Sequence, residues 1–350
     1  MHPGAGPWAE AVGLYVEGSG LAQRLLERVN AGLAGNPPQG SGRSGDSGAV
    51  VVFDVGLGGG ANALAAVECH RALSEGGRNP RPLHLVSFER APEGLEFARE
   101  EAEALGYPRG HEDTLDDLLE EHRAEPAPGI TWELRVGDFS ALIHEEPHRA
   151  DIVFFDPFSP KANPGLWSLE TLEGLYACRR RGASTVLVTY SSAFNTRAAM
   201  LLAGFYVGEG PLTSGPAAGS GQHGRPSASR GHTTVAATEF QALEHPLTPG
   251  WLGRWRRERN PWPPGTPPSK HRQLRTALVE HSQWAYGSPP RPVEEPRAGK
   301  PQSGTPPPVN PGSSRRSRAR ARQGNPPEDR GPASPEAGKV NKGRRPRYPR

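Results

Sequence analysis

Cysteine is scarce in this sequence, with only Cys69 and Cys178 among 350 residues and no Cys-x-x-Cys spacing. This scarcity excludes a disulfide framework and a zinc knuckle, and it fits a reducing compartment. Long apolar runs are also lacking, because no segment approaches about eighteen apolar residues and the N-terminus has no basic stretch followed by an apolar one. We therefore expect no membrane span and no secretory signal, and we expect the protein to be cytoplasmic.

Glycine and proline are abundant instead, with 44 and 39 residues, which favours one domain with non-globular ends over two domains. Residues 288–350 hold 15 Lys/Arg against 5 Asp/Glu and almost no apolar side chains. Such a stretch cannot bury enough apolar surface to offset its chain entropy, so we predict a disordered basic tail. The tail either only solvates the protein or supplies phosphate contacts to a nucleic acid, since residues 1–287, with 26 basic and 33 acidic residues, are mildly acidic.

Short apolar runs alternate with amphipathic stretches through the middle of the chain. The runs predict strands at 49–56, 83–89, 130–137, 150–156, 184–191, 205–210 and 232–240. This alternation predicts an α/β, Rossmann-like fold with a mostly parallel seven-stranded sheet, helices on both faces and a C-terminal antiparallel hairpin. We predict four segments: N-terminal helices and a linker (1–46), the sheet domain (47–240), a helical extension (241–287) and the tail (288–350).

A glycine-rich loop, DVGLGGGAN (54–62), joins the first predicted strand to the next helix. Glycine tolerates positive φ and lets a ligand lie against bare backbone at a helix N-terminus. Gly56, Gly58 and Gly60 fit the Gly-x-Gly-x-Gly pattern common in S-adenosylmethionine sites, whereas Gly56, Gly58 and Ala61 fit a dinucleotide pattern. A helix-start turn without any ligand is the third alternative.

Acidic residues end the next two predicted strands. Glu89 can accept both ribose hydroxyl protons of an adenosine, and it lies 33 residues after Gly56, well beyond the roughly 20 residues of a nicotinamide fingerprint. A nicotinamide oxidoreductase is therefore the weaker interpretation. Asp138 can contact an adenine edge or cap the following helix, and the two roles are compatible.

The segment DPFSPKANPGLW (156–167) follows an apolar run directly. Pro157 and Pro160 prevent further strand pairing, so a stiff loop stands at the C-terminal end of a strand, the edge where ligands bind in open α/β sheets. The loop that begins with Asp156 and Phe158 is therefore either a well-made turn or the lip of an active site.

Further residues of this edge are candidates for substrate binding. Lys161, Asn163 and Trp167 can hold the loop or contact RNA, and packing is as good an interpretation as contact for Asn163 and Trp167. Tyr190 ends the next strand at the same edge, where a tyrosine is more often packed than catalytic. Pro157 completes the set as a loop residue beside Asp156.

These segments resemble a class I S-adenosylmethionine-dependent methyltransferase, and more narrowly the MnmC-like methyltransferase domain of the tRNA wobble-uridine modification enzymes. The resemblance is carried, in family order over about residues 50–210, by GLGGGANALAA, LHLVSFERAP, GDFSALI, DIVFFDPFSPKANPGLWS and LVTYSSAFNTRAAMLLAGF. It implies S-adenosylmethionine as cofactor, no metal, and a monomer that methylates the 5-aminomethyl group of a tRNA wobble uridine. It implies two catalytic residues: Asp156, whose carboxylate orients the amine and takes up its proton, and Phe158, which offers a face on which the flipped pyrimidine stacks. The residues it implies for the cofactor are Asp54, Gly56, Gly58, Gly60, Asn62, Glu89, Asp138 and Asp156.

Two departures from the family pattern bear on the substrate. Many members are fused to a flavin-dependent oxidoreductase domain, and an oxidoreductase activity on amino groups accompanies the family, but this sequence offers no second dinucleotide loop and we expect the stand-alone form. The basic glycine segment before the final strand is replaced by SGQHGRPSASRGHTTVAAT, with Arg225 and Arg230 in its place. Two alternatives therefore stay open: a methyltransferase for another RNA, a protein or a small molecule, or an inactive cofactor-binding protein that interacts with RNA.

Overall fold

The computed structural model describes residues 6–27, 48–212 and 232–286. These described residues belong to one compact unit. Three segments discussed above lie outside the described residues: most of the predicted linker, the loop that contains Arg225 and Arg230, and the basic tail. Among the described residues, no helix combines the length and the apolar character that crossing a membrane requires.

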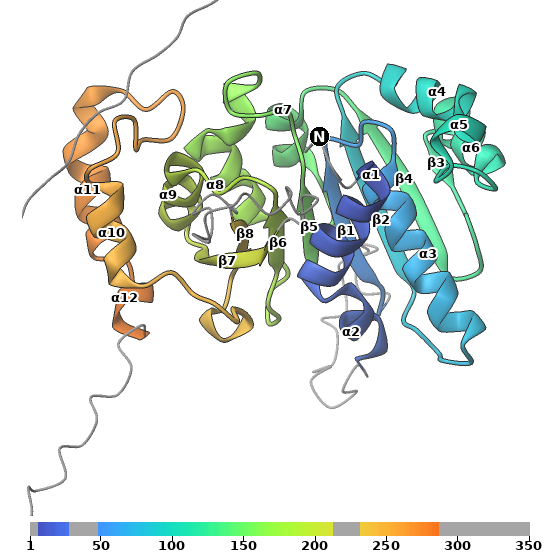
Figure 1. Ribbon diagram of the computed structural model, residues 1–350, viewed down its shortest axis with the longest axis horizontal. Coiled ribbons are helices and arrows are strands. Elements are labelled where there is room, and N and C mark those ends of the chain that lie inside the picture. The colour runs from blue at the N-terminus through green and yellow to red at the C-terminus, as the bar shows by residue number, and fades with distance from the viewer. Residues whose placement is uncertain (1–5, 28–47, 213–231, 287–350) are drawn as a thin grey trace, which may run out of the picture. The chain divides into compact units, whose positions relative to one another are not determined.

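An eight-stranded sheet runs through the described residues in the order β3-β4-β2-β1-β5-β6-β8-β7 (Figure 1). The five strands from β4 to β6 are parallel, whereas β3, β8 and β7 each pair antiparallel with their neighbours. The strands are β1 (Val50–Val55), β2 (Leu83–Glu89), β3 (Arg123–Ala124), β4 (Ile130–Val136), β5 (Ile152–Phe155), β6 (Val186–Thr189), β7 (Tyr206–Leu212) and β8 (His232–Ala237). The predicted fold class is confirmed, with one strand more than expected, since the two-residue β3 is too short to show a periodicity.

Helices cover both faces of the sheet, as predicted (Figure 1). The first face carries α1 (Gly6–Glu10), the π-helix η1 (Ala11–Glu17), α2 (Leu21–Leu26), α3 (Ala61–Glu75), α4 (Glu93–Glu100), α5 (Ala102–Leu105) and α6 (Glu112–Glu121). The second carries α7 (Phe139–Glu145), η2 (Pro164–Trp167), α8 (Leu169–Ala177), α9 (Phe194–Ala203), α10 (Pro249–Trp255), α11 (His271–Val279) and α12 (Gln283–Tyr286). Two short 3-10 turns, η3 (Phe240–Ala242) and η4 (Pro268–Lys270), connect the last elements.

Because helices cover both faces of the sheet, the side chains of β1 are apolar along almost the whole strand. Val50 and Val52 belong to the core under the first set of helices, whereas Val51 and Phe53 belong to the core under the second. A parallel strand buried on both faces has no solvent side and therefore needs no polar alternation.

The predicted C-terminal extension packs on the sheet domain through a buried amide. The side chain of Gln283 in α12 accepts a hydrogen bond from the Val207 N–H at 2.6 Å and donates to the Val207 and Leu247 carbonyls at 2.8 and 2.9 Å. The Gln283 amide thus provides hydrogen-bond partners for the free backbone N–H and carbonyl of an edge strand. These bonds attach residues 271–286 to β7.

Strand register collects the predicted site at one edge. Val55 of β1 pairs with Phe88 of β2 and Phe155 of β5, and Glu89 pairs with Val136 of β4. The chain therefore leaves four neighbouring parallel strands at the same level. The glycine loop and the loops that follow β2, β4 and β5 meet there, which is the edge where open α/β sheets bind ligands.

Candidate active site

Asp156 is the first residue after β5, and the glycine loop holds it. Its backbone N–H donates to the Val55 carbonyl at 2.9 Å, and its Oδ2 accepts a hydrogen bond from Asn62 Nδ2 at 3.0 Å. A β-carbon on Gly56, whose φ is +86°, would lie 2.7 Å from the Asp156 carbonyl oxygen. Gly56 therefore allows the two loops to touch, and Asn62, predicted to bind the cofactor, contacts the predicted catalytic carboxylate directly.

Burial raises the pKa of Asp156 to about 6, although hydrogen bonds from Tyr15 and Asn62 act in the opposite direction. A carboxylate with this pKa is ionised at neutral pH, yet it is basic enough to accept a proton from a substrate. The environment of Asp156 thus suits the proton-accepting role that its position in the sequence predicts.

Tyr15 is a site residue that the sequence did not reveal. It lies on η1, is fully buried and packs against Phe154 with ring centroids 5.6 Å apart. Its hydroxyl makes no hydrogen bond of standard geometry among the described residues, yet it is close enough to Asp156 to lower the pKa of that carboxyl, while burial followed by the Asp156 charge raises the pKa of Tyr15 itself. The only signal in the sequence was a polar-tipped ring on an apolar helix face; π-helices are frequent at functional sites, but sequence periodicity does not show them.

The glycine loop has the free backbone that a cofactor requires. Gly58 has φ +52° and no atom within 4 Å of the place where a β-carbon would stand, and its N–H donates to Glu89 Oε2 at 2.9 Å. The other carboxylate oxygen of Glu89 accepts from the Arg90 N–H at 2.8 Å, and each oxygen keeps a further lone pair for a ribose hydroxyl. Gly60, with φ +80°, faces Leu95 instead, because its β-carbon would lie 3.1 Å from that side chain. The residues present therefore fit S-adenosylmethionine over Gly58 and beside Glu89.

Asp54 lies beneath this loop rather than at its surface, and its contact with the cofactor stays a prediction. It is fully buried, and its Oδ2 accepts from the Ser87 hydroxyl at 2.9 Å, which in turn accepts from Trp132 Nε1 at 2.9 Å. Its Oδ1 has no hydrogen-bond partner among the described residues, and burial raises its pKa to about 7. Asp54 is placed to support the loop from below.

Asp138 caps α7, one of the two roles left open above. Its Oδ1 accepts from the Ser140 N–H at 2.9 Å and from the Ser140 hydroxyl at 2.7 Å, and these bonds lower its pKa. The residue remains exposed at the edge beside Glu89. Capping therefore leaves it accessible to an adenine.

The loop after Asp156 divides into a buried support and an exposed face. Trp167 is fully buried, donates from Nε1 to the Phe158 carbonyl at 2.8 Å and packs edge-on against Phe155 and Tyr190, so it supports the loop and does not reach a substrate. Tyr190 donates to the carbonyl of the buried Pro157 at 3.0 Å. The aromatic side chain of Phe158, by contrast, is 80% exposed.

Two candidate substrate-binding residues lie farther along this loop. Lys161 is exposed and Asn163 is half-buried, with its backbone N–H bonded to the Ser159 carbonyl at 2.9 Å. Both follow Phe158 in the same loop, and their contact with a substrate stays a prediction.

A cluster of His84, Glu133 and His148 lies away from this edge, with possible ligand atoms within 4.8 Å of one another. Glu133, however, accepts hydrogen bonds from Arg123 on one oxygen and from Arg135 on the other. Two guanidinium groups already compensate this carboxylate, which disfavours a cation at the same place. We interpret the cluster as an ion-pair network.

Comparison with known proteins places this geometry in a family. Residues 108–215 match the family described as S-adenosyl-L-methionine-dependent methyltransferase. The tRNA 5-methylaminomethyl-2-thiouridine biosynthesis bifunctional protein MnmC of Paracidovorax citrulli is 32% identical over 173 residues, 46% of this chain and 25% of that protein. The protein of the same name from Cupriavidus metallidurans is 31% identical over 222 residues, 60% of this chain and 29% of that protein. The chain thus spans little more than a quarter of the length of these relatives.

Among solved structures, the crystal structure of MNMC2 from Aquifex aeolicus has a TM-score of 0.51 and 20% identity, and the match covers 81% of this chain and 77% of that one. At this identity the likeness shows the fold. The sheet, the glycine loop and the family match define a class I S-adenosylmethionine-dependent methyltransferase. Within that class, the chain carries an MnmC-like methyltransferase domain, and its cofactor is S-adenosylmethionine. The oxidoreductase activity that accompanies the family is not supported for this domain.

Proposed function

We propose that this domain methylates an amino nitrogen, and specifically the 5-aminomethyl group of a tRNA wobble uridine. The observation that carries the proposal is the placement of Asp156 at the strand end, in contact with the glycine loop and followed by an exposed aromatic ring. The name of the relatives, which refers to tRNA 5-methylaminomethyl-2-thiouridine biosynthesis, supports the choice of substrate.

The residues of the chain divide the work as follows. When bound, S-adenosylmethionine supplies a methyl group on a positively charged sulfur, which keeps the electron pair of the carbon–sulfur bond. Gly58 and Glu89 hold the cofactor at the strand ends. Asp156 accepts a hydrogen bond from the substrate amine and thereby orients the lone pair of the nitrogen. Asp156 also takes up the proton that the nitrogen loses. Asn62 and Tyr15 keep the Asp156 carboxylate in one orientation.

Phe158 gives the reaction its substrate platform. Its ring is 80% exposed at the ligand-binding edge, and an unstacked pyrimidine can stack on such a ring. The wobble position lies in a single-stranded loop of tRNA, where a base can leave its stack at low cost. Phe158 is therefore proposed to stack on the uridine while Asp156 receives its amine.

The test is methyl transfer to tRNA of defined modification state. Purified protein is incubated with isotope-labelled S-adenosylmethionine and either tRNA that carries 5-aminomethyluridine derivatives or an unmodified transcript, and the nucleosides are separated by mass spectrometry. We expect label only in the aminomethyl nucleoside. Label in the unmodified transcript, in protein or in small molecules would replace the proposed acceptor, and binding of the cofactor without any transfer would favour the inactive alternative.

A further inference from the structure

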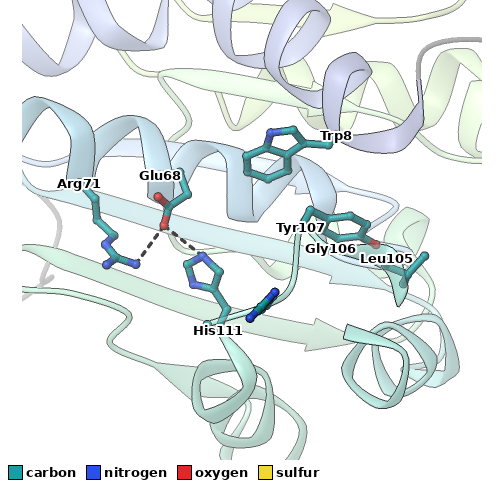
Figure 2. A pocket seen from close by; sticks show the side chains of 9 residues that line it. Trp8, Glu68, Arg71, Leu105, Gly106, Tyr107 and His111 are labelled. Atoms are coloured by element: carbon teal, nitrogen blue, oxygen red, sulfur yellow. Dashed lines mark hydrogen bonds and ion pairs between the residues drawn. The ribbon is translucent and has the colours of Figure 1, made fainter. Parts of the chain in front are cut away.

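A hollow in the protein surface lies next to the glycine loop, outside the candidate active site. It has a volume of about 560 Å³ and is lined by Trp8 of α1, Glu68 and Arg71 of α3, and residues 105–107 and 109–111 of the segment between α5 and α6. Figure 2 shows the rings of Trp8 and Tyr107 along one side of the hollow and the side chains of Glu68, Arg71 and His111 along the other. Its volume is within the range of sites that bind small ligands.

The aromatic side of the hollow suits a flat ring. The rings of Trp8 and Tyr107 are nearly parallel, with an interplanar angle of 12° and centroids 6.1 Å apart, and both are only half-buried. An offset pair of this kind leaves ring surface toward the cavity. Bases stack on such surfaces with little dependence on sequence, because every base has a π-face.

The opposite side of the hollow carries two guanidinium groups. Arg71 pairs with Glu68 at 3.0 Å, and Nε2 of His111, whose pKa burial lowers, lies 3.0 Å from the same carboxylate. Arg109 makes only one long ion pair, with the exposed Glu103 at 3.6 Å. The lining residues therefore carry two guanidinium groups against one carboxylate, in a part of the chain that is acidic overall.

The hollow is joined to the cofactor loop by a hydrogen bond. The Tyr107 hydroxyl donates to the Gly59 carbonyl at 3.0 Å, so a residue that lines the hollow also fixes the backbone next to Gly58. A β-carbon on Gly59 would stand 2.5 Å from that hydroxyl. A ligand in the hollow would thus lie on the same side of the molecule as the loop that holds the cofactor.

We propose that this hollow binds one nucleotide of the RNA substrate, with the base against Trp8 and Tyr107 and the phosphate at Arg109 and Arg71. The proposal rests on RNA being the substrate, and it adds a contact remote from Phe158. Arg109 is 68% exposed and its pair with Glu103 is long, so its guanidinium can exchange that partner for a phosphate. An aromatic pair beside such a guanidinium matches a nucleotide, which combines a flat ring with an anion. A bare phosphate would leave the rings uncovered, and an apolar ligand would make no use of the guanidinium groups.

The experiment measures RNA affinity and not turnover. Fluorescence anisotropy of a fluorescein-labelled anticodon stem-loop RNA is followed with the full chain and with Trp8→Leu, Trp8→Phe and Arg109→Glu. We expect Trp8→Leu to raise Kd about tenfold through loss of base stacking and Trp8→Phe to restore most of the affinity. Arg109→Glu should raise Kd about tenfold and lower the slope of log Kd against log salt by about one.

A matched charge reversal serves as the control. Arg181 is exposed in the turn after α8, on the second face of the sheet, and Arg181→Glu changes the net charge by the same amount. We expect less than a twofold change in Kd for this variant. Equal Kd values for wild type, Trp8→Leu and Arg109→Glu would overturn the proposal, as would equal losses in Arg109→Glu and Arg181→Glu.

The same proteins separate this inference from the proposed function. A wild type that methylates tRNA while Trp8→Leu and Arg109→Glu bind RNA normally removes only the second site. A wild type whose RNA affinity depends on Trp8 and Arg109 but which transfers no methyl group to tRNA removes only the proposed reaction. A wild type without measurable RNA affinity overturns both.

Discussion

The side-chain amide of Asn62 donates to the carboxylate of Asp156 at 3.0 Å, across 94 residues of sequence. Asn62 lies in the first turn of α3, the helix after the glycine loop, and Asp156 begins the loop after β5. This bond ties the cofactor half of the site to the catalytic half, because any movement of the glycine loop reaches the carboxylate. The predictions below depend on that coupling and on the burial of Asp54 and Asp156.

Replacement of Asp156 by alanine should remove turnover and leave the cofactor. We expect Asp156→Ala to lower kcat by roughly 10²-fold or more, the usual effect of losing a general base or positioning group, with nearly unchanged affinity for S-adenosylmethionine. Single-turnover rates with the aminomethyl substrate and equilibrium dialysis of the cofactor measure the two effects. Wild-type turnover in this variant would remove Asp156 from the mechanism.

The pH dependence of kcat/KM should report the raised pKa of Asp156. Activity requires the ionised carboxylate, so we expect an acid limb near pH 6 rather than near pH 4. Tyr15→Phe and Asn62→Ala each remove an interaction that lowers this pKa, so both should move the limb to higher pH. Tyr286→Phe, which alters an exposed tyrosine in α12, is the control and should leave the limb in place. An unmoved limb in Tyr15→Phe would contradict the assigned contact.

Substitutions of Gly58 and Gly56 should have different effects on the protein. Gly58→Leu places its side chain in open space, so we expect a folded protein that no longer binds S-adenosylmethionine, against a micromolar Kd, or about −8 kcal/mol, for wild type. Gly56→Ala meets the Asp156 backbone at 2.7 Å and should lower thermal stability and turnover together. Calorimetry of the cofactor and thermal unfolding of both variants separate the two cases. NAD should show no measurable affinity for any of these proteins.

Asp54 should make stability depend on pH. Burial raises its pKa in the folded state to about 7, well above the ordinary value for an aspartate, so its contribution is present below about pH 4 and is lost as pH rises through 7. Asp54→Asn stays neutral, and we expect its stability relative to wild type to increase between pH 5 and pH 8, by an amount on the order of 2–4 kcal/mol. Urea unfolding at the two pH values measures this difference.

A second carboxyl serves as the comparison for Asp54. Asp138 has a lowered pKa because Ser140 donates to it, so its stabilising contribution is present above its unfolded pKa and is lost only in acid. Asp138→Asn should therefore show no gain between pH 5 and pH 8. If the difference in unfolding free energy between Asp54→Asn and wild type stays constant over the same range, the pKa of the Asp54 carboxyl is not raised in the folded protein.

The fold could be predicted because its signals are local. Each buried strand appears as an apolar run of four to seven residues, as in β1 and β5, and each is followed by a helix or a turn with its own glycine or proline. The strand β3 could not be predicted, since two residues carry no period and only the neighbouring β4 defines them. The π-helix at Ala11–Glu17 lies among the predicted N-terminal helices, and its hydrogen-bond pattern could not be predicted because sequence periodicity does not show π-helices.

Within the site, the sequence by itself determined the chemistry at the strand ends: the glycines of the loop, Glu89, Asp156 and the exposed Phe158 follow from motifs whose residues are adjacent in the chain. Only the tertiary structure decided which of these groups are buried and which contact one another. It buried Trp167 and Asp54, turned Asn62 toward Asp156 and brought Tyr15 to the same carboxylate. The physical reason is that burial and the pKa shifts it causes depend on packing between distant segments, and the direction in which a side chain points is not encoded by its neighbours in sequence.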